Sequence, residues 1–446
     1  MKSGLTDKQK QMLAYGEAHP YSLLCADPRL GKSRVAILLA KKRKVPCLII
    51  CPSYLISNWK KEILKWWPTA QVTTFRAAKQ IYEPFDSDFV VTSYDLIRKA
   101  EFLFDWWAKM TVWDEIHAVK NMASIRSQFL HRVLYENSLP YFHGLTGTPL
   151  KNRVKEFYSL IALASYNPKK TDQKFLDTFP DEITFADKFS FSKSYKVKVQ
   201  KGKKKFKIQI TNYYGLKNEK ELRTWLKGKY IRIRADKNDL PPISYLDTLV
   251  SDIDNKDLLK SFNAYFADER EIREAIKEGD ITEAEAREMR TGSVLPEHKR
   301  NAAMQKVPFT IKYVENLLES VECCLIYTDH VEACKQIADH FKVPAITGKM
   351  SATRRGQLVH DFQASKLNII CATIGSLKEG ADLFRSKDVV INDPTWVPGD
   401  ILQVINRTRA LGEKEPRTVH RILGSPQDEK IWGALLEKTK TIDKAT

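Results

Sequence analysis

The chain has 446 residues, which is too long for one ordinary hydrophobic core and predicts two or three domains. Its 73 Lys and Arg exceed its 55 Asp and Glu, and the net charge of +18 falls on a chain with ample apolar and aromatic residues, which excludes disorder. Nucleic acid is the expected partner, because each Lys or Arg contact with a phosphate releases counterions and so increases binding affinity. A membrane partner is not expected, since no stretch approaches the roughly twenty apolar residues of a spanning helix.

The N-terminus and the cysteines indicate the compartment. The first ten residues, MKSGLTDKQK, lack the apolar core of a secretion signal, so we expect an intracellular, cytoplasmic protein. The seven cysteines occur singly or as the adjacent pair Cys323-Cys324, which predicts reduced core residues and no structural zinc. The basic run at 41–45 fits a nuclear import signal or the end of a helix, where Lys and Arg are favoured, and the second interpretation carries more weight.

An apolar strand, a tight loop and an apolar helix follow one another near the N-terminus. The loop at 26–33 reads ADPRLGKS. This architecture is typical of loops that wrap backbone N–H groups around a β-phosphate, with Lys32 on the β- and γ-phosphates and Ser33 on Mg²⁺. The loop departs from the usual pattern, because Ala26 stands at its first glycine and Arg29 stands where relatives of this kind carry another glycine.

Two adjacent carboxylates end a short apolar strand at 110–113. A pair of acids at the end of a buried strand is costly unless a cation and a water use them. Asp114 is therefore the candidate ligand of Mg²⁺, and Glu115 is the residue that orients or deprotonates the attacking water. The alternative is a solvated strand end, but the other matching stretches of the chain favour the catalytic interpretation.

Strands and helices alternate through the first third of the chain. Buried strands are expected at 46–53, 89–94 and 141–149, and a helix with aromatic residues is expected at 55–66. This alternation predicts a doubly wound parallel sheet whose loops gather at the carboxyl ends of the strands. The ligand is expected at that edge.

The order of these stretches and their amino-acid sequences resemble those of the Swi/Snf-type ATPases of helicase superfamily two. The matching stretches are Gln9 as the adenine-reading glutamine, ADPRLGKS at 26–33 as motif I, LIICPSYLISNWKKE at 48–62 as motif Ia, VVTSYDLI at 90–97 as motif Ib, DEIHAVKN at 114–121 as motif II and LTGTPLKN at 145–152 as motif III. The resemblance implies ATP and Mg²⁺ as cofactors and DNA as the polymer.

The resemblance also implies roles for individual residues. Nucleic-acid contacts are expected at Pro52, Ser53, Thr92, Ser93, Tyr94, Thr328 and Thr373. Thr146 and Thr148 are expected to pass the state of the γ-phosphate to the nucleic-acid face. The expected nucleotide-binding residues are Gln9, Arg29, Gly31, Lys32, Ser33, Gly380, Asp382 and Gln403, with Mg²⁺ on Ser33 and Asp114.

The segment 166–245 breaks the alternation. Two alternating strands at 195–200 and 203–210 around a glycine turn predict a β-hairpin. Residues 193–237 contain 16 Lys and Arg against 3 acids, which favours a DNA-contacting hairpin over a merely solvated face. The expected nucleic-acid residues of this hairpin are Lys201, Lys203, Lys204 and Lys205.

The stretch 206–242 resembles the corresponding segment of the annealing and fork-remodelling branch of the same family. Its paired arginines are split here, because Ile233 stands between Arg232 and Arg234. This resemblance supports branched DNA as the substrate. The following residues, 251–300, have the charged helical pattern of an exposed protrusion.

The second half returns to strand and helix alternation and closes the family pattern with motif VI at 403–412. An arginine that reaches the γ-phosphate from a second lobe would stabilise transferred charge. The usual spacing places the two arginines at 407 and 410, but position 410 is Ala and Arg409 comes one residue early. We therefore expect Arg407 to be the arginine finger with Arg409 assisting, and a phosphate-binding basic helix is the alternative for Arg409.

These features predict an α/β chain with two RecA-like, doubly wound parallel-sheet lobes. The expected domains are lobe 1 at 1–165, the basic insertion at 166–245, a helical protrusion at 246–300 and lobe 2 at 301–446. The expected function is that of a monomeric ATP-dependent DNA translocase or helicase acting on forked or branched DNA. The alternatives are a duplex translocase that displaces proteins without unwinding, a catalytically weak DNA clamp and, less favoured, an RNA helicase.

Overall fold

The structure is a computed structural model that describes residues 4–81, 86–149, 154–166, 173–201, 204–214, 216–236, 239–250, 294–377, 382–395, 397–410, 412–424, 428, 432–433 and 435–436. The chain divides into two compact units. The first unit, lobe 1, comprises Met1–Phe191 and Tyr214–Asp239, and the second, lobe 2, comprises Ser192–Tyr213 and Leu240–Lys440. Each lobe is built on a β-sheet of its own.

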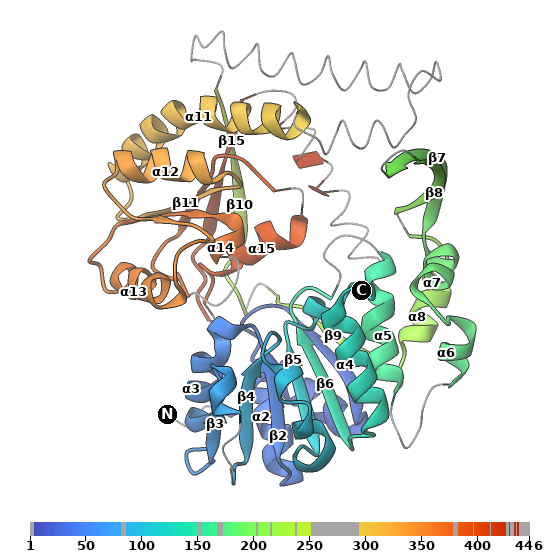
Figure 1. Cartoon of the computed structure of the whole chain (residues 1–446). Coiled ribbons are helices and arrows are strands. Elements are labelled where there is room, and N and C mark those ends of the chain that lie inside the picture. The colour runs from blue at the N-terminus through green and yellow to red at the C-terminus, as the bar shows by residue number, and fades with distance from the viewer. Residues whose placement is uncertain are drawn as a thin grey trace. The chain divides into compact units, whose positions relative to one another are not determined.

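Lobe 1 is built on a seven-stranded sheet in which every pairing is parallel (Figure 1). Its order is β3-β4-β2-β5-β6-β1-β9. The strands are β1 (Tyr21–Ala26), β2 (Cys47–Cys51), β3 (Val72–Thr74), β4 (Phe89–Ser93), β5 (Met110–Asp114), β6 (Tyr141–Thr146) and β9 (Tyr230–Ile233). Since the carboxyl ends of parallel strands share one edge, the loops that follow β1, β5 and β6 meet there.

Apolar residues cover both faces of this sheet, as parallel strands require. Leu48 and Ile50 of β2 belong to one core, whereas Ile49 of the same strand belongs to the other. Helices α1 (Asp7–Ala18), α2 (Lys32–Arg43) and α3 (Ile56–Trp66) pack into the second core, and α4 (Ile125–Glu136) and α5 (Phe157–Ser165) pack into the first. The two layers of helices enclose a doubly wound sheet, as the sequence predicts.

Lobe 2 repeats the plan with a six-stranded parallel sheet of order β10-β15-β14-β11-β13-β12. The strands are β10 (Ile243–Leu249), β11 (Cys324–Thr328), β12 (Ala345–Ile346), β13 (Ile369–Thr373), β14 (Asp388–Ile391) and β15 (Arg417–Leu423). The helices are α11 (Val294–Leu318), α12 (Val331–His340), α13 (Ala352–Gln363), α14 (Ile374–Leu377) and α15 (Pro398–Asn406). Helices α11 and α12 pack into one core of the lobe, and α13 and α15 pack into the other. The predicted fold of two parallel α/β lobes is confirmed.

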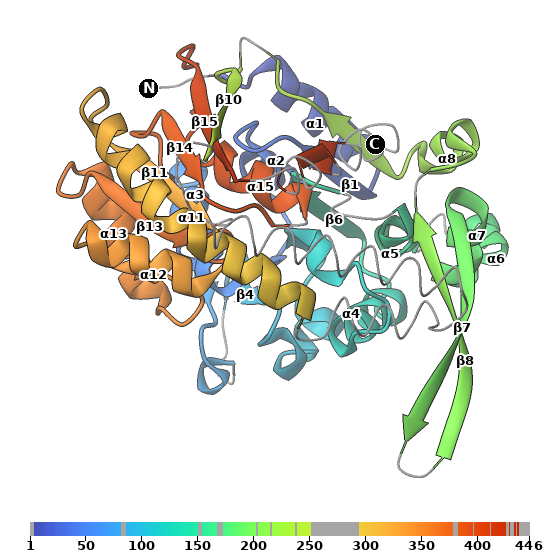
Figure 2. The ribbon, with the colours of Figure 1, turned by 90° about the horizontal axis from the view of Figure 1, so that it is seen from above.

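The predicted insertion at 166–245 contains the expected hairpin. Strands β7 (Phe191–Lys201) and β8 (Lys204–Tyr214) pair only with each other among the described strands and form a long twisted ribbon (Figure 2). Helices α6 (Gln173–Thr178), α7 (Glu182–Phe189) and α8 (Glu219–Leu226) flank the hairpin in the chain. The charged stretch predicted as a helical protrusion lies outside the described residues over 251–293.

The same segment also supplies strands to both sheets, which the sequence did not indicate. Strand β9 extends the first sheet by pairing with β1, and β10 extends the second sheet by pairing with β15. The predicted boundary between 245 and 246 therefore falls inside β10. Both strands are short or largely exposed, and β10 lies at a sheet edge, so their apolar patterns are weak.

The cysteines agree with the sequence prediction. All seven cysteines are free thiols in buried positions, as predicted. Among the described residues, no helix combines the length and the apolar character needed to cross a membrane.

One buried histidine makes the stability of lobe 1 depend on pH. Arg43 Nη1 donates to Nε2 of His143 at 2.7 Å, and arginine accepts no hydrogen bond, so Nδ1 carries the proton and donates to Ser22 Oγ at 2.9 Å. Burial, together with Arg43, lowers the pKa of His143 well below its usual value. The neutral ring is therefore required in the folded state.

We predict that the free energy of unfolding falls as pH drops below about 6.5. In this range His143 binds a proton in the unfolded chain, whereas it stays neutral in the folded chain. The contribution reaches about 1.4 kcal/mol per pH unit. His143→Gln, whose amide keeps both hydrogen bonds, should lose this part of the slope in urea titrations at pH 5 to 7. His360→Gln, at an exposed histidine, should keep it. Equal slopes in wild type and His143→Gln would contradict the assignment.

Candidate nucleotide and nucleic-acid sites

The loop between β1 and α2 has the backbone of a phosphate loop. Gly31 is the N-cap of α2 and lies in the left-handed region at φ 85°, and a Cβ there would lie 2.2 Å from Gln9 Nε2. Only glycine fits this position. Arg29 is also left-handed, at φ 73°, a conformation that glycine adopts without strain and that costs another residue about 1 kcal/mol. The free N–H groups at the start of α2 face the loop and favour an anion.

Lys32 lies in the first turn of α2 and reaches back into the loop. Its Nζ donates to the carbonyl oxygen of Ala26 at 2.7 Å and to that of Asp27 at 3.4 Å. Burial lowers the pKa of Lys32, while the charges of Glu115 and Asp114 oppose that shift. The predicted phosphate-binding lysine and the acid pair are therefore within electrostatic reach of each other, and Ser33 is the next residue of the same helix.

Gln9 is buried beside this loop. Its Nε2 donates to the carbonyl oxygen of Leu30 at 3.4 Å, and its Oε1 accepts from Arg34 Nη1 at 3.2 Å and from the backbone N–H of Thr6 at 3.3 Å. The Arg34 guanidinium lies 3.8 Å from the centre of the Trp66 ring. The amide predicted to read adenine thus contacts the phosphate loop directly, and its orientation is fixed by donors to its oxygen.

Asp114 ends β5 in a buried position with every carboxylate oxygen engaged. Trp59 Nε1 on α3 donates to Oδ2 at 2.9 Å, and the backbone N–H of Glu115 donates to Oδ1 at 3.0 Å. Burial raises the pKa of Asp114 to about 6, and the neighbouring Glu115 charge adds to the rise. Tyr94 donates its hydroxyl to the Asp114 carbonyl oxygen at 2.9 Å, which ties the end of β4 to motif II.

Glu115 begins the turn after β5 in a strained backbone conformation. Its φ of 50° and ψ of 51° place it in the left-handed region. Its Oε2 lies 3.2 Å from His117 Nδ1, and this nitrogen lies 3.4 Å from Thr146 Oγ1 at the end of β6. The backbone N–H of Thr148 donates to the same Thr146 hydroxyl at 3.0 Å. Motif II and motif III are therefore connected through His117, while the relay predicted for Thr146 and Thr148 stays a prediction.

The donors at this edge fit Mg²⁺ held together with phosphates. Among the described residues no group of three or more His, Cys, Asp or Glu side chains could hold a metal ion alone. Mg²⁺ commonly uses one or two protein oxygens and completes its shell with water and phosphate oxygens. Burial and the Glu115 charge raise the pKa of Asp114 although Trp59 and Lys32 oppose the rise, and a bound cation would further favour the ionised carboxylate.

The side chains predicted to contact nucleic acid in lobe 1 are largely buried. Thr92 and Ser93 of β4 and the following Tyr94 are all less than 4% exposed. Ser53 is exposed and Pro52 is partly exposed at the end of β2. The nucleic-acid roles of the three buried side chains stay predictions.

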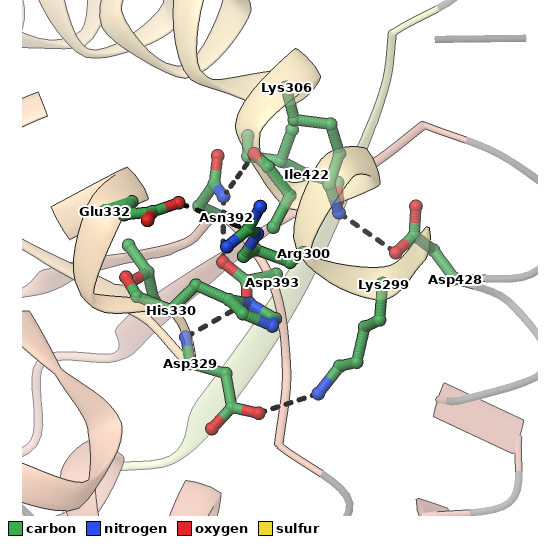
Figure 3. Close-up of polar contacts among 12 residues, drawn as sticks. Lys299, Arg300, Lys306, Asp329, His330, Glu332, Asn392, Asp393, Ile422 and Asp428 are labelled. Carbon is green, nitrogen blue, oxygen red and sulfur yellow. Dashed lines mark hydrogen bonds and ion pairs between the residues drawn. The ribbon is translucent and has the colours of Figure 1, made fainter. Parts of the chain in front are cut away.

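Thr328, one of the two predicted contacts of lobe 2, ends β11. The residues that follow β11 and β14 form a polar cluster around Asp393 (Figure 3). Thr328 donates its hydroxyl to the carbonyl oxygen of His330 at 2.6 Å. His330 Nδ1 and the Asp329 backbone N–H both donate to Asp393 Oδ2, at 2.7 and 3.0 Å. Burial would raise the pKa of Asp393, but the hydrogen bond from His330 lowers it below its usual value. Lys299 pairs with Asp329 at 2.6 Å, so α11 is joined to this edge.

The two arginines of motif VI have different surroundings. Arg409 donates from Nε to the Pro241 carbonyl oxygen at 2.7 Å and from Nη1 to Asn406 Oδ1 at 2.8 Å, so its guanidinium holds the chain just before β10. Arg407 follows α15 and lies near Tyr327. Arg409 therefore holds the chain before β10, and the role of Arg407 as the arginine finger stays a prediction.

The remaining predicted residues fall on several elements. Thr373 ends β13 and donates to Ser376 Oγ at 3.0 Å. Gln403 is buried in α15, and Asp382 is exposed. Gly380 lies outside the described residues. In the hairpin, Lys201 ends β7 and Lys204 and Lys205 begin β8, while Lys203 lies outside the described residues.

Three contact residues of the site were not predicted from the sequence as functional. Trp59 holds Asp114, His117 faces Glu115, and Arg232 of β9 contacts the phosphate loop. Trp59 lies within motif Ia and His117 within motif II, so their positions in the motifs were the available signal. Arg232 belongs to the stretch 206–242 that resembles a family segment, but nothing in the sequence indicated its contact with Asp27, which lies 205 residues away.

The fold and the site define a two-lobed parallel-sheet protein of the helicase superfamily-two class. A family model for the SNF2-related domain matches residues 8–207, and one for the helicase conserved C-terminal domain matches residues 307–412. Together the two matches span more than half of the chain. The chain belongs to the Swi/Snf family of superfamily two, as its motifs indicated.

The chain is similar to much longer curated proteins. It is 25% identical to the SWI/SNF-related matrix-associated actin-dependent regulator of chromatin subfamily A-like protein 1 of Xenopus tropicalis, over 95% of this chain and 43% of that protein. It is 22% identical to an uncharacterized ATP-dependent helicase of Mycoplasma genitalium, over 95% of this chain and 40% of that protein. The chain thus spans less than half the length of these relatives.

The chain is also similar to a solved structure, the Sulfolobus solfataricus SWI2/SNF2 ATPase core in complex with dsDNA. It is 20% identical, covers 99% of this chain and 93% of its own, and gives a TM-score of 0.43.

We predict that Trp59→Phe weakens binding of Mg²⁺ and ADP at pH 7 by about tenfold. The variant removes a hydrogen bond to a charged group, worth about 1.5–3 kcal/mol, and so raises the pKa of Asp114 further. Mg²⁺ requires the ionised carboxylate, so wild-type affinity should fall below about pH 6 and the affinity of the variant should fall at higher pH. Fluorescent-ADP titrations measure both. Trp67→Phe is the matched control, because the lost indole N–H donates to Thr69 Oγ1 instead of Asp114, and it should behave as wild type.

Proposed function

We propose that the chain is an ATP-dependent DNA translocase that remodels forked or branched DNA. The proposal rests on one observation above all, which is that Lys32, Asp114 and Glu115 are gathered at one edge of the first sheet within electrostatic reach of one another. A lysine on a phosphate loop, a buried carboxylate and a second acid are the parts that NTP hydrolysis requires. Family membership supports the same reaction.

In the proposed reaction Gln9, Lys32 and Ser33 bind ATP, and Ser33 and Asp114 hold Mg²⁺, which neutralises phosphate charge when bound. Glu115 orients and deprotonates the attacking water. The neighbouring His117, 3.2 Å from the Glu115 carboxylate, holds that side chain in place. Arg29 and Gly31 shape the loop through their left-handed backbone, and Thr146 and Thr148 relay the state of the site through His117.

In lobe 2, Arg407 is proposed to stabilise charge on the transferred phosphoryl group, and Arg409 is proposed to assist by holding the chain before β10. Gly380, Asp382 and Gln403 are proposed to line the nucleotide on the same lobe. This arrangement would make hydrolysis depend on both lobes.

DNA is the proposed polymer because of the charge and its distribution. The chain carries a net charge of +18, and a stretch with 16 Lys and Arg against 3 acids includes the β7-β8 hairpin. A two-stranded ribbon with basic side chains is suited to phosphate contacts and to a wedge at a DNA junction. The motif ends at Pro52, Ser53, Thr328 and Thr373 are proposed to contact the backbone of the DNA.

We predict that Lys32→Ala and Glu115→Gln each reduce DNA-stimulated ATP hydrolysis by about 100-fold or more, because each removes charge stabilisation or water activation at the reacting phosphate. Phosphate release with duplex, single-stranded and branched DNA measures the effect. DNA binding should be retained within a few fold.

Lys42→Ala provides the control, because Lys42 is an exposed lysine near the other end of the same helix, paired with Glu17. It should leave hydrolysis unchanged. Unchanged turnover in either site variant would refute the mechanism. A wild-type chain that binds DNA tightly and releases no phosphate would instead identify a clamp, and stronger stimulation by RNA than by DNA would identify an RNA-directed motor.

We predict that replacing Lys201 and Lys203 to Lys205 with glutamine impairs remodelling of forked and four-way DNA by about tenfold while ATP hydrolysis changes less than about threefold, because fewer phosphates are neutralised at the junction. Strand-displacement assays on labelled substrates measure the first effect. The salt dependence of binding should become shallower. If no strands separate with any substrate, the chain is a duplex translocase that displaces proteins without unwinding.

A further inference from the structure

An ion pair joins the phosphate loop to strand β9. Arg232 Nη2 donates to Asp27 Oδ1 at 2.6 Å, and both side chains are mostly buried, at 15% and 26% exposure. The other carboxylate oxygen, Oδ2, accepts from the backbone N–H of Ala235 at 2.9 Å, and the Asp27 backbone N–H donates to the Ile233 carbonyl oxygen at 3.0 Å. Every hydrogen-bonding group of Asp27 that faces β9 is therefore engaged.

The same arginine also reaches motif III. Arg232 Nη1 donates to the Gly147 carbonyl oxygen at 3.2 Å, in the loop that follows β6. Gly147 itself lies against the phosphate loop, since a Cβ there would lie 3.3 Å from Pro28 Cδ. One guanidinium thus bridges the phosphate loop and motif III from a strand at the edge of the sheet, where β9 pairs only with β1 among the described strands.

The charge of Asp27 bears directly on Lys32. The Lys32 ammonium group donates to the Asp27 carbonyl oxygen. The charge of the Asp27 carboxylate favours the protonated form of Lys32, and the charge of Arg232 disfavours it, so the two charges shift the pKa of Lys32 in opposite directions. If Arg232 were absent, a partly buried carboxylate without its cation would remain within reach of that ammonium group and would repel incoming phosphates. The ion pair keeps Asp27 bound to β9.

We propose that Arg232 is a positioning residue of the nucleotide site, which neutralises Asp27 and so leaves Lys32 available to the phosphates. The inference rests on the proposed ATP-binding function and adds to it a residue for which the sequence predicted no role at the nucleotide. Arg232 also belongs to the segment that carries the basic hairpin, so the chain that is proposed to contact DNA continues into a strand that holds the phosphate loop.

The test compares Arg232→Ala, Arg232→Lys, Asp27→Asn and the double variant Asp27→Asn with Arg232→Ala in the full chain. Arg232→Ala should raise the Kd for Mg²⁺ and ADP, and the KM for ATP, at least tenfold. Adding Asp27→Asn should restore both to within about threefold of wild type, since the uncompensated charge is removed. Arg232→Lys keeps the charge and should bind nucleotide within about threefold of wild type.

Arg234→Ala, on an exposed neighbour in the same segment, is the control and should leave both constants unchanged. A merely structural arginine would give a loss that the second substitution deepens, and that result would overturn the inference, as would unchanged affinity in Arg232→Ala. Thermal melting separates folding from binding, and Arg232→Lys keeps the test decisive if Arg232→Ala unfolds. A wild-type chain that binds no nucleotide would refute the proposed function itself, whereas failed rescue in a nucleotide-binding chain refutes only the role of Arg232.

Discussion

The nucleotide site of lobe 1 depends on opposite charges that are buried or partly buried near one another at the carboxyl edge of a parallel sheet. Lys32 is held by carbonyl oxygens of its own loop and faces the charges of Asp114 and Glu115. None of these groups would be stable there alone, because burial disfavours each charged form. Their mutual presence, the indole N–H of Trp59 and the start of α2 offset much of that cost. The raised pKa of Asp114 is the part that is not offset, and a cation would complete the balance.

A second set of contacts makes this edge a connected structure. His117 lies between Glu115 and Thr146, and Thr146 accepts a hydrogen bond from Thr148. Tyr94 ties the end of β4 to motif II. These residues belong to separate motifs in the chain, and parallel strand pairing brings them to one edge. A change at the acid pair can therefore alter motif III through direct contacts, which is the physical form that coupling would take in this lobe.

Lobe 2 follows the same plan with different chemistry at its strand ends. The carboxyl ends of β11 and β14 carry a hydrogen-bonded cluster centred on Asp393, which accepts from His330 and from the Asp329 backbone. In motif VI, Arg409 holds the backbone at Pro241, and Arg407 is the arginine finger of the proposed mechanism. Strands β9 and β10, on either side of Pro241, belong to different sheets.

The sequence by itself determined the two parallel sheets, the β7-β8 hairpin and the main members of the site. Buried strands such as β2 and β11 are continuous apolar runs, and motifs such as 26–33 and 114–121 are local, so a linear reading detects both. Only the tertiary structure decided that β9 extends the first sheet, that Thr92 and Ser93 are buried, and that Arg232 holds Asp27. These facts follow from pairing and packing between residues far apart in the chain, and short polar strands leave no periodic pattern that would reveal their partners.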